Sequence, residues 1–508
     1  MRKVTTTVAA ALVAFSFAAC NKTNNSVTPE EGGNTYGKVI VEENATNRDV
    51  TDGEKNDVSG QGGESAVANG KLYTGTATDL TLTDLNFTAA GGVESKWETK
   101  PFLYAGVTGQ DIPAGLVLNG TFGVDEFGAD KEVGIDKLAE LTKKEGFAMS
   151  SVATQKLNIK PGVAKGAVAA DNNEFSFDVE RITAKVQVSK TATIGKGELK
   201  GTFSDLRYAV AGSAKTSYIF RDHAGERDMK ADAKYDNFTS AIHTLAGTTF
   251  KQEEGKKVID VARDLQTVSD KSLTTLATDD KWGKYNSLEL KEDANYKTAS
   301  NAEGIYFLEN SFDKVPTAAR QLLYNDIVYV KVYATYAPAD NEVLKLKDDG
   351  KTLVGATAAE VVANENGTFF RGNVKNKLYL TAAAAKADGN SKAYRYNKGR
   401  MYWRVPANKQ NLGKDFTSYA DTRRNNIYSL QVTDILELGG NYDPIDPKDP
   451  NIPAPGEKDG DDKPTPKNPD EPTPDPEDPV DESENYMKVN VQVLQYNLVH
   501  RGLKLSRD

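Results

Sequence analysis

The residue types that most often carry enzymatic chemistry are scarce in this chain and lack the necessary spacing. Of its 508 residues, three are histidines (His223, His243 and His500) and one is a cysteine, Cys20. The sequence has no H-E-x-x-H pair, no G-x-S-x-G elbow and no phosphate-binding glycine loop followed by lysine. A single cysteine excludes an internal disulfide and a cysteine-based metal site. We therefore predict a protein that is not an enzyme, with no catalytic residues, no metal centre and no cofactor.

Two groups of polar residues could form a functional site or could belong to ordinary surface turns and tethers. Arg221-Asp222-His223 could belong to a site, but a polar turn after an apolar strand ending at Phe220 is the more common arrangement. The acidic runs near the C-terminus lack the alternating register and trailing glutamate of a calcium loop. Among 73 acidic residues, spacing alone singles out no catalytic carboxylate pair.

The N-terminus carries an export signal that ends at the single cysteine. Arg2 and Lys3 precede a short apolar stretch, Val4 to Phe17, which is too short to span a bilayer. Small residues directly before Cys20 resemble the bacterial lipoprotein box, in which the cysteine is lipidated and becomes the first residue. The alternative is an ordinary signal peptidase site with an incidental cysteine.

Arg48 is a candidate site for proteolytic processing. It is the sole arginine between Arg2 and Arg181, and a Gly/Asp/Ser-rich run to about Gly63 follows it. Exposed polar loops of this kind are where proteolytic cuts concentrate. A protease specific for arginine would leave Asp49 as the new N-terminus. The alternative is an ordinary surface arginine.

The C-terminal end combines a stiff spacer with an isolated apolar strand. Residues 443–484 hold 12 of the 19 prolines and 15 acidic residues against four lysines, a composition typical of an extended, self-repelling tether. The strand that follows needs a sheet edge, because an unpaired apolar strand promotes aggregation. It either folds back onto its own chain or completes another molecule. Its candidate pairing residues are Tyr486, Met487, Val489, Val491, Val493, Leu494, Tyr496 and Leu498.

The apolar phase of this strand changes at Val493–Leu494, which predicts a β-bulge or a twist there.

The rest of the chain predicts a mainly β fold. Short strand candidates recur, many of them separated by glycine-rich turns, including Tyr36 to Glu42, Leu80 to Phe87 and Asp326 to Pro338. One helix is expected over Ile135 to Glu145. Many short strands without regular βαβ alternation favour antiparallel β-sandwiches.

The net charge of −10 resides in the spacer. Its 15 acids and four lysines give −11, which leaves about +1 for the remainder. A near-neutral body without a basic stripe argues against a nucleic-acid partner.

Several segments, taken in order, resemble a known family. They are the lipoprotein signal ending at Cys20, the isolated Arg48, VERITAKVQV (179–188), SYIF (217–220), YFLENSF (306–312), RRNNIYSLQVTDILELG (423–439), the spacer and the last strand. In this order they are similar to fimbrillins, the pilins of Bacteroidota type V fimbriae, and most like the stalk subunit of the minor (short) fimbriae.

The resemblance implies a fold and a domain division. Family members have two transthyretin-like antiparallel β-sandwich domains. The expected division is signal peptide 1–20, propeptide 21–48, N-terminal sandwich 49–195, C-terminal sandwich 196–442, spacer 443–485 and donor strand 486–508.

The resemblance also implies an assembly mechanism. An exported lipoprotein precursor (a palmitate-bearing one) reaches the outer membrane, and an Arg-specific protease cuts after Arg48. The segment removed opens a groove, which the donor strand of another subunit fills. Implied partners are further copies of the chain, tip and anchor subunits, and receptors on host or bacterial surfaces. The mature form would lie in a cell-surface fimbria that mediates adhesion and virulence. The alternative function is a monomeric surface lipoprotein that binds a glycan or a protein.

Overall fold

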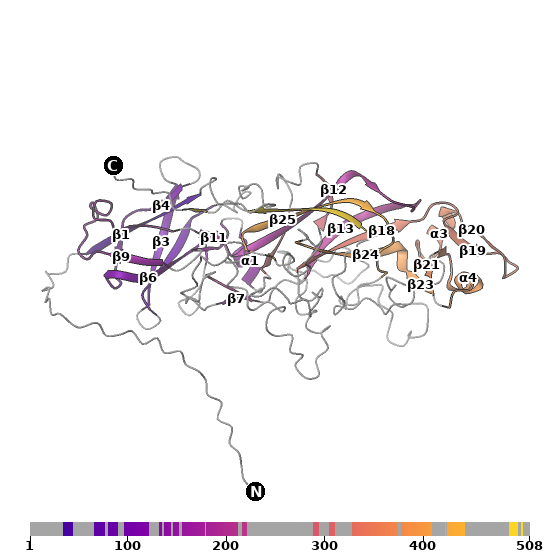
Figure 1. The fold of residues 1–508 in the computed structure, drawn as a ribbon, viewed down its shortest axis with the longest axis horizontal. Coiled ribbons are helices and arrows are strands. Elements are labelled where there is room, and N and C mark those ends of the chain that lie inside the picture. Colours follow the sequence, from indigo (N-terminus) through magenta and orange to yellow (C-terminus); the bar gives the residue numbers. More distant parts are fainter. Residues whose placement is uncertain are drawn as a thin grey trace, which may run out of the picture.

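The structure, a computed structural model, is elongated, with the N-terminal strands at one end and a small sheet at the other (Figure 1). It describes residues 34–43, 66–76, 80–89, 96–120, 132–134, 137–143, 146–151, 155–177, 179–211, 216–220, 288–293, 304–309, 328–373, 377–391, 393–408, 422, 424–441, 487–495 and 499–500. Strands dominate this part of the chain, so the prediction of a mainly β fold is confirmed.

The first sheet builds the N-terminal end of the molecule. Its order is β10-β1-β27-β11-β8-β6-β2-β3-β4, with β5 paired to β1 and β9 to β6. An additional β1–β4 pairing curls the sheet onto itself. Its strands are β1 (Thr35–Glu43), β2 (Asn69–Thr74), β3 (Thr81–Ala89), β4 (Lys96–Thr99), β5 (Phe102–Tyr104), β6 (Gly109–Leu118), β8 (Met149–Ser151), β9 (Gln155–Ile159), β10 (Glu174–Ser176), β11 (Val179–Arg181) and β27 (Val499–His500).

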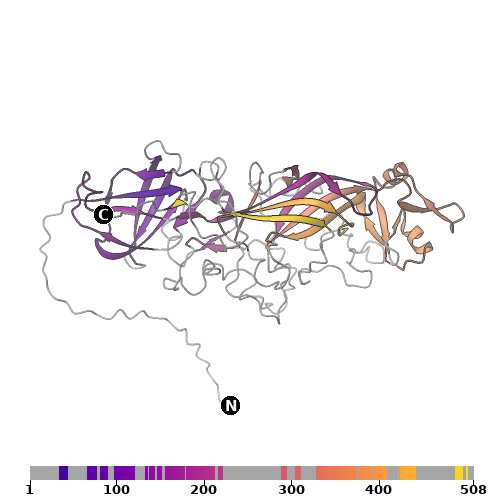
Figure 2. The ribbon, with the colours of Figure 1, turned by 45° about the horizontal axis from the view of Figure 1, so that its top comes forward.

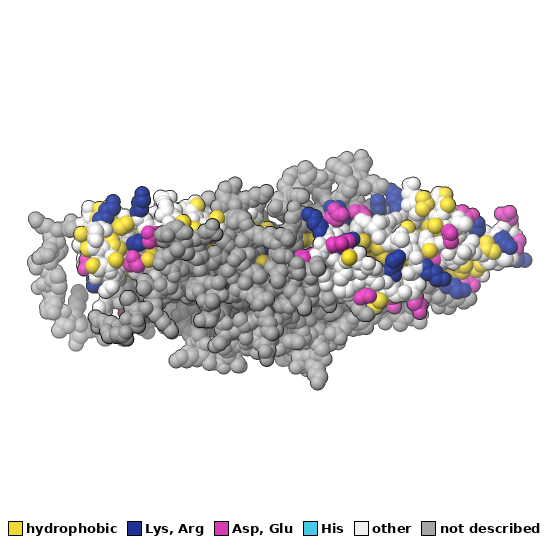
Figure 3. All heavy atoms as spheres, turned by 90° about the horizontal axis from the view of Figure 1, so that it is seen from above, with side chains coloured by type: hydrophobic (Ala, Val, Ile, Leu, Met, Phe, Trp, Pro, Cys, Tyr) yellow, Lys and Arg dark blue, Asp and Glu magenta, His cyan; other side chains and the backbone are white. Residues whose placement is uncertain are grey.

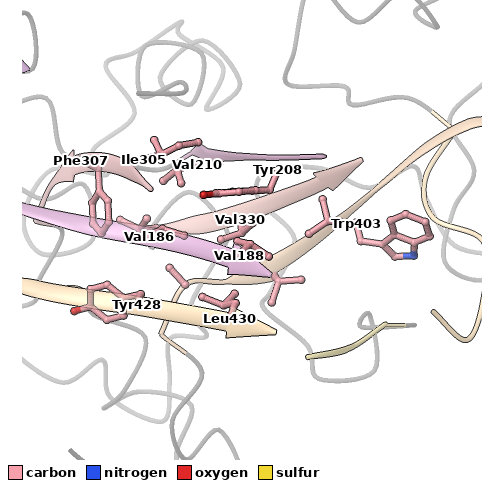
Figure 4. Packing of buried hydrophobic residues seen from close by; sticks show 14 of the residues in the cluster. Val186, Val188, Tyr208, Val210, Ile305, Phe307, Val330, Trp403, Tyr428 and Leu430 are labelled. Carbon is pink, nitrogen blue, oxygen red and sulfur yellow. The ribbon is translucent and has the colours of Figure 1, made fainter. Parts of the chain in front are cut away.

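Two sheets face each other in the second half and form a β-sandwich. One has the order β16-β12-β25-β26 with β17 paired to β12, and the other has the order β15-β13-β18-β24. Apolar side chains from both sheets meet between them (Figure 4). The strands are β12 (Thr183–Gly195), β13 (Thr202–Ala211), β15 (Leu288–Glu289), β16 (Lys291–Glu292), β17 (Ile305–Leu308), β18 (Tyr329–Ala337), β24 (Arg400–Pro406), β25 (Asn426–Ile435) and β26 (Met487–Gln495).

A third, smaller unit caps the far end of the sandwich. It has the order β20-β19-β22-β21-β23 and lies between β18 and β24 in the chain. Helix α3 (Ala358–Ala363) begins with a capping box between Thr357 and Glu360, which satisfies free backbone N–H groups. The other elements are β19 (Val343–Leu346), β20 (Leu353–Gly355), β21 (Phe369–Gly372), β22 (Leu378–Tyr379), α4 (Ala382–Ala387), β23 (Ala393–Tyr396) and the 3-10 turn η7 (Asn397–Gly399).

The predicted helix is present but short. Helix α1 covers Leu138–Leu141, against the expected Ile135 to Glu145. Thr142 closes it, because its backbone N–H and its hydroxyl both donate to the Leu138 carbonyl oxygen, at 3.1 and 2.8 Å. Nearby, β7 (Glu132–Gly134) pairs with β14 (Thr216–Tyr218) and links the two halves.

Most strand pairs are antiparallel, as expected, but four described pairs are parallel: β1–β10, β12–β16, β12–β25 and β19–β22. Alternating apolar residues from Phe175 to Val188, with a phase shift at Glu180–Arg181, predict one long strand with a bulge, but the structure divides this stretch into β10, β11 and β12. The phase shift arises because β11 belongs to the first sheet, whereas β12 pairs with β16, β17 and β25 of the sandwich. The domain bounds and the transthyretin-like topology stay predictions, and the pairing of β12 favours a division near Ile182 over one at residue 195.

Candidate functional site

Strand β1 occupies an inner position of the first sheet, although it belongs to the segment before Arg48. On one side it runs parallel to β10, with Val39 opposite Phe175. On the other side it pairs antiparallel with β4 and β5. The side chains of Val39 and Val41 are fully buried. We call the space that β1 fills between β10 on one side and β4 and β5 on the other the β1 slot.

The slot is lined by aromatic and aliphatic side chains that form one cluster with β1. The cluster joins Val39 and Val41 to Trp97, Phe175 and Val179, among others. At Gly37 a β-carbon would lie 3.1 Å from the Phe175 ring and 3.2 Å from the Phe102 ring. The strand can therefore pass between these two rings because a glycine stands at this position.

Polar groups outside the strand ladder also hold β1. The backbone N–H of Val39 donates to Oγ1 of Thr99 at 3.0 Å. Nδ2 of Asn173 donates to the Tyr36 carbonyl oxygen at 3.1 Å, and the Gly162 N–H donates to Oγ1 of Thr35 at 2.9 Å. These bonds fix the position of β1 along the slot, because each involves one particular residue of the strand.

Lys38 is the one lysine of β1, and it lies between two carboxylates. Its Nζ is 2.6 Å from Glu98 on β4 and 3.5 Å from Glu174 on β10. Burial alone would lower the pKa of Lys38, but the hydrogen bond to Glu98 and the charge of Glu174 together raise this pKa above its usual value. The ammonium group thus bridges the two strands that flank the slot.

The C-terminal strand β26 lies in the same chain against β25 (Figure 2). Val489, Val491 and Val493 stand opposite Val432, Leu430 and Tyr428, which are buried residues of the sandwich core. Among the described strands, β26 pairs with β25 alone and forms the sheet edge. The pairing runs without interruption through Val493 and Leu494, so a β-bulge there, one of the two predicted alternatives, is wrong. The register shift lies between Val432 and Asp434 of β25.

The chain end returns to the first sheet after β26. In β27, Val499 stands opposite Glu43 of β1 and also opposite Val179 of β11, and His500 stands opposite Glu42. The C-terminal segment therefore contacts both halves of its own chain, and its last strand adjoins the end of β1.

The predicted site residues are only partly described. Cys20, Arg48, Asp49, Tyr486, Tyr496 and Leu498, together with His223 and His243, lie outside the described residues. Met487, Val489, Val491, Val493 and Leu494 are in β26. The structure does not bring these residues into the β1 slot, which β1 itself fills.

Sequence reasoning identified the strand Tyr36 to Glu42 but missed the residues that hold it. Thr99, Asn173 and Glu98 lie 60, 137 and 60 positions from their partners Val39, Tyr36 and Lys38. No local pattern marks such long-range partners. The glycine within an apolar strand, Gly37, is the one signal of a close approach.

The described residues contain no group of three or more potential metal ligands. No described helix combines the length and apolarity needed to cross a membrane.

A cavity of about 510 Å³ lies between the small sheet β20-β19-β22-β21-β23, called the far sheet below, and the sandwich. Its lining residues include Leu199, Leu344, Arg371, Lys377 and Leu436. On the face that Figure 3 shows, charged side chains of both signs are interspersed among the described residues.

Residues 394–501 match the family model "Major fimbrial subunit protein type IV, Fimbrillin, C-terminal". The expected resemblance to fimbrillins is thereby confirmed for this C-terminal part of the chain. A fimbrilin from Porphyromonas gingivalis W83 is 15% identical, with a TM-score of 0.39 over 92% of this chain and 99% of that chain. A candidate cell adhesion protein from Parabacteroides distasonis ATCC 8503 is 12% identical, with a TM-score of 0.42 over 93% of this chain and 99% of that chain.

Proposed function

We propose, from the fimbrillin match of residues 394–501 and the position of β1, that this chain is a pilin of the minor fimbriae that polymerises by strand exchange. One observation carries the proposal. An inner strand of the first sheet, Thr35–Glu43, comes from the segment that a cut after Arg48 would separate from the rest of the chain. Once that segment leaves, the sheet lacks an inner strand.

An empty β1 slot is costly in two ways. Three consecutive residues of β1, Val39 to Val41, are buried, and each such side chain contributes about 1.5–3 kcal/mol on burial before entropy is subtracted. The backbone groups of β10 and β4 that faced β1 also lose their partners, and unpaired buried groups cost about 1–3 kcal/mol each. A replacement strand would recover both terms.

The C-terminal strand has the properties of such a replacement. It is apolar at alternate positions and already pairs with a strand edge in its own chain. Exchange with a neighbour is a head-to-tail contact, so it continues into a filament and does not close. The acidic, proline-rich spacer can extend by about 3.1 Å per residue, which gives the strand the reach for a neighbouring molecule.

Cleavage would change both the acceptor slot and the C-terminal donor segment. It removes the occupant of the slot, and it removes Glu42 and Glu43, against which β27 pairs. After cleavage, the described pairing of β27 is reduced to Val179 opposite Val499. The propeptide thus both blocks the acceptor and holds the end of the donor segment, which delays assembly until export is complete.

The finer parts of the proposal follow the resemblance. Cys20 would be lipidated and carry the precursor to the outer membrane, and an Arg-specific protease would expose Asp49. Two transthyretin-like domains would form each subunit, and tip and anchor subunits would complete the fimbria. The fibre would adhere to host surfaces or to other bacteria, as a stalk built from this chain.

The alternative, a monomeric surface lipoprotein that binds a glycan or a protein, draws on the intramolecular β25–β26 pairing and on the cavity beside Arg371. Protease-treated protein run on a denaturing gel with and without boiling separates the two functions. Strand-exchanged polymers resist the detergent and give a ladder that boiling collapses. A single band in both lanes would refute the pilin proposal and favour the monomeric binder.

A further inference from the structure

A buried cluster of charged residues lies where the first sheet meets the sandwich. Glu180 and Arg181 end β11, Glu309 follows β17, and Arg424 directly precedes Asn425 and β25. The side chains of Glu180 and Arg424 are fully buried, and that of Glu309 is 3% exposed. Full burial of several charges is rare unless they are paired, so the cluster needs an explanation beyond surface solubility.

Arg424 is the centre of this cluster. Its Nε and Nη2 lie 2.7 and 2.6 Å from Oε1 of Glu309, and its backbone N–H donates to Oε2 at 3.1 Å. Nη1 donates to the Ile219 carbonyl oxygen at 3.1 Å. Nε also lies 3.9 Å from Oε1 of Glu180 in the first sheet. One guanidinium group therefore joins three segments that are far apart in sequence.

Asn425 continues the link from the sandwich to the first sheet. Its Oδ1 accepts hydrogen bonds of 3.2 Å from both the backbone N–H and Nη1 of Arg181. Its own N–H donates to the Thr183 carbonyl oxygen at 2.9 Å. Its φ of +59° lies in the left-handed region, which asparagine tolerates better than most residues. In this conformation the side chain of Asn425 lies within hydrogen-bonding distance of Arg181.

The segment from Phe177 to Arg181 contacts both β1 and the residue that precedes β25. The Phe177 N–H donates to the Ile40 carbonyl oxygen of β1 at 3.4 Å, and Arg181 four residues later binds Asn425. Asn426 then stands opposite Gln495, the last residue of β26. The acceptor slot and the sheet that stores the donor strand are therefore connected through one set of hydrogen bonds.

Apolar contacts also join the halves but constrain their orientation less. Phe220 lies against Tyr73, with ring centroids 6.3 Å apart, and Phe147 against Tyr306, at 4.8 Å. Apolar burial is non-directional, so such contacts tolerate rotation and sliding. Hydrogen bonds from a planar guanidinium group to a carboxylate are directional.

We propose that Glu180, Arg181, Glu309, Arg424 and Asn425 form an orientation clamp, which fixes the angle between the β1 slot and the β25–β26 sheet. Buried ion pairs often add little net stability but can specify one arrangement. In the fibre, this angle would set how each subunit is placed on the next, a consequence that rests on the proposed function. The clamp itself is a property of the single chain.

Single-molecule energy transfer on the full-length monomer tests the clamp. Cys20→Ser leaves no native cysteine, and Lys156→Cys and Glu292→Cys place dyes at exposed positions of the first sheet and the sandwich. The parent should give one narrow distribution of transfer efficiency. Glu309→Gln, which leaves Arg424 facing a neutral amide, should widen it by about twofold or more as the halves rotate.

Two further variants make the result decisive. Asn425→Gly removes the acceptor of both Arg181 bonds while keeping an allowed φ, so it should widen the distribution even if Glu309→Gln fails to fold. Val361→Ala in α3, a buried residue away from the junction, controls for general loss of stability and should leave the width unchanged. An unchanged width in folded Asn425→Gly would overturn the clamp. Widening in Asn425→Gly, together with a protease-treated parent that forms no fibres, would support the clamp while counting against strand exchange.

Discussion

The backbone N–H of Val39 donates a hydrogen bond of 3.0 Å to the hydroxyl of Thr99, in a region where both residues are buried. The two residues lie on opposite sides of Arg48 in the sequence. If Arg48 is the processing site, cleavage removes the donor and leaves the acceptor in the mature subunit. The same acceptor would then be available to a replacement strand, which makes Thr99 a probe of what occupies the β1 slot.

Thr99→Val should lower the free energy of unfolding of the precursor and leave that of the cleaved monomer unchanged. In the precursor the Val39 N–H loses its acceptor, at a cost of about 1–3 kcal/mol for a buried unpaired donor. Urea unfolding of the two forms measures the difference. Thr88→Val is the control, because its hydroxyl makes an exposed contact of 3.4 Å to the Glu98 carbonyl oxygen and should change both forms little. Equal losses in precursor and cleaved protein would show that Thr99 does not act through β1.

The sequence predicted strands well and their partners poorly. The strand candidates Tyr36 to Glu42 and 326–338 are both present, as β1 and β18, and in β18 the apolar residues of one face are buried as alternation predicts. In β18, however, Tyr329 and Lys331 on the opposite face are also buried, which alternation does not predict. The inner position of β1, its bond to Thr99 and the Arg424 cluster arise from contacts between residues 54 or more positions apart. A local pattern carries no information on such contacts.

Arg48→Ala should keep residues 21–48 attached and prevent fibre formation. The slot then stays filled by β1, so no acceptor exists for a donor strand. N-terminal sequencing of surface-extracted protein should find an Asp49 start in the parent and none in the variant. Lys55→Ala is the matched control, since it removes a neighbouring positive charge without removing the arginine. Fibres built from the Arg48→Ala protein would place the cleavage site elsewhere.

Tyr379 should make the stability of the far sheet fall at alkaline pH. Burial first, and then the hydrogen bond donated to Asp388 at 2.8 Å, raise the pKa of Tyr379 to about 12 from its usual 10.0. The folded state therefore holds this proton more tightly than the unfolded state. Its stabilising contribution is complete below pH 10 and is lost as the pH rises through about 12.

Tyrosinate absorbance, taken as the difference between the parent and Tyr379→Phe, follows this single titration. Asp388→Asn removes the negative charge beside the phenol and should move the titration to lower pH. A titration that stays in place in Asp388→Asn would mean that burial alone sets the pKa of Tyr379.

Val491→Asp should abolish polymerisation. Val491 stands opposite Leu430, whose side chain is 1% exposed, and opposite residues of an antiparallel pair share one face of the sheet. A carboxylate at this position would have to be desolvated both on β25 and in an apolar slot, which is strongly unfavourable without a partner. Protease-treated variant should run as monomer on an unboiled gel. Gln492→Asp adds the same charge one residue later, on the face where the opposite residue is the polar Ser429 and not an apolar residue, and should still give a ladder. Normal ladders from Val491→Asp, or equal loss in both variants, would contradict this register for the donor strand.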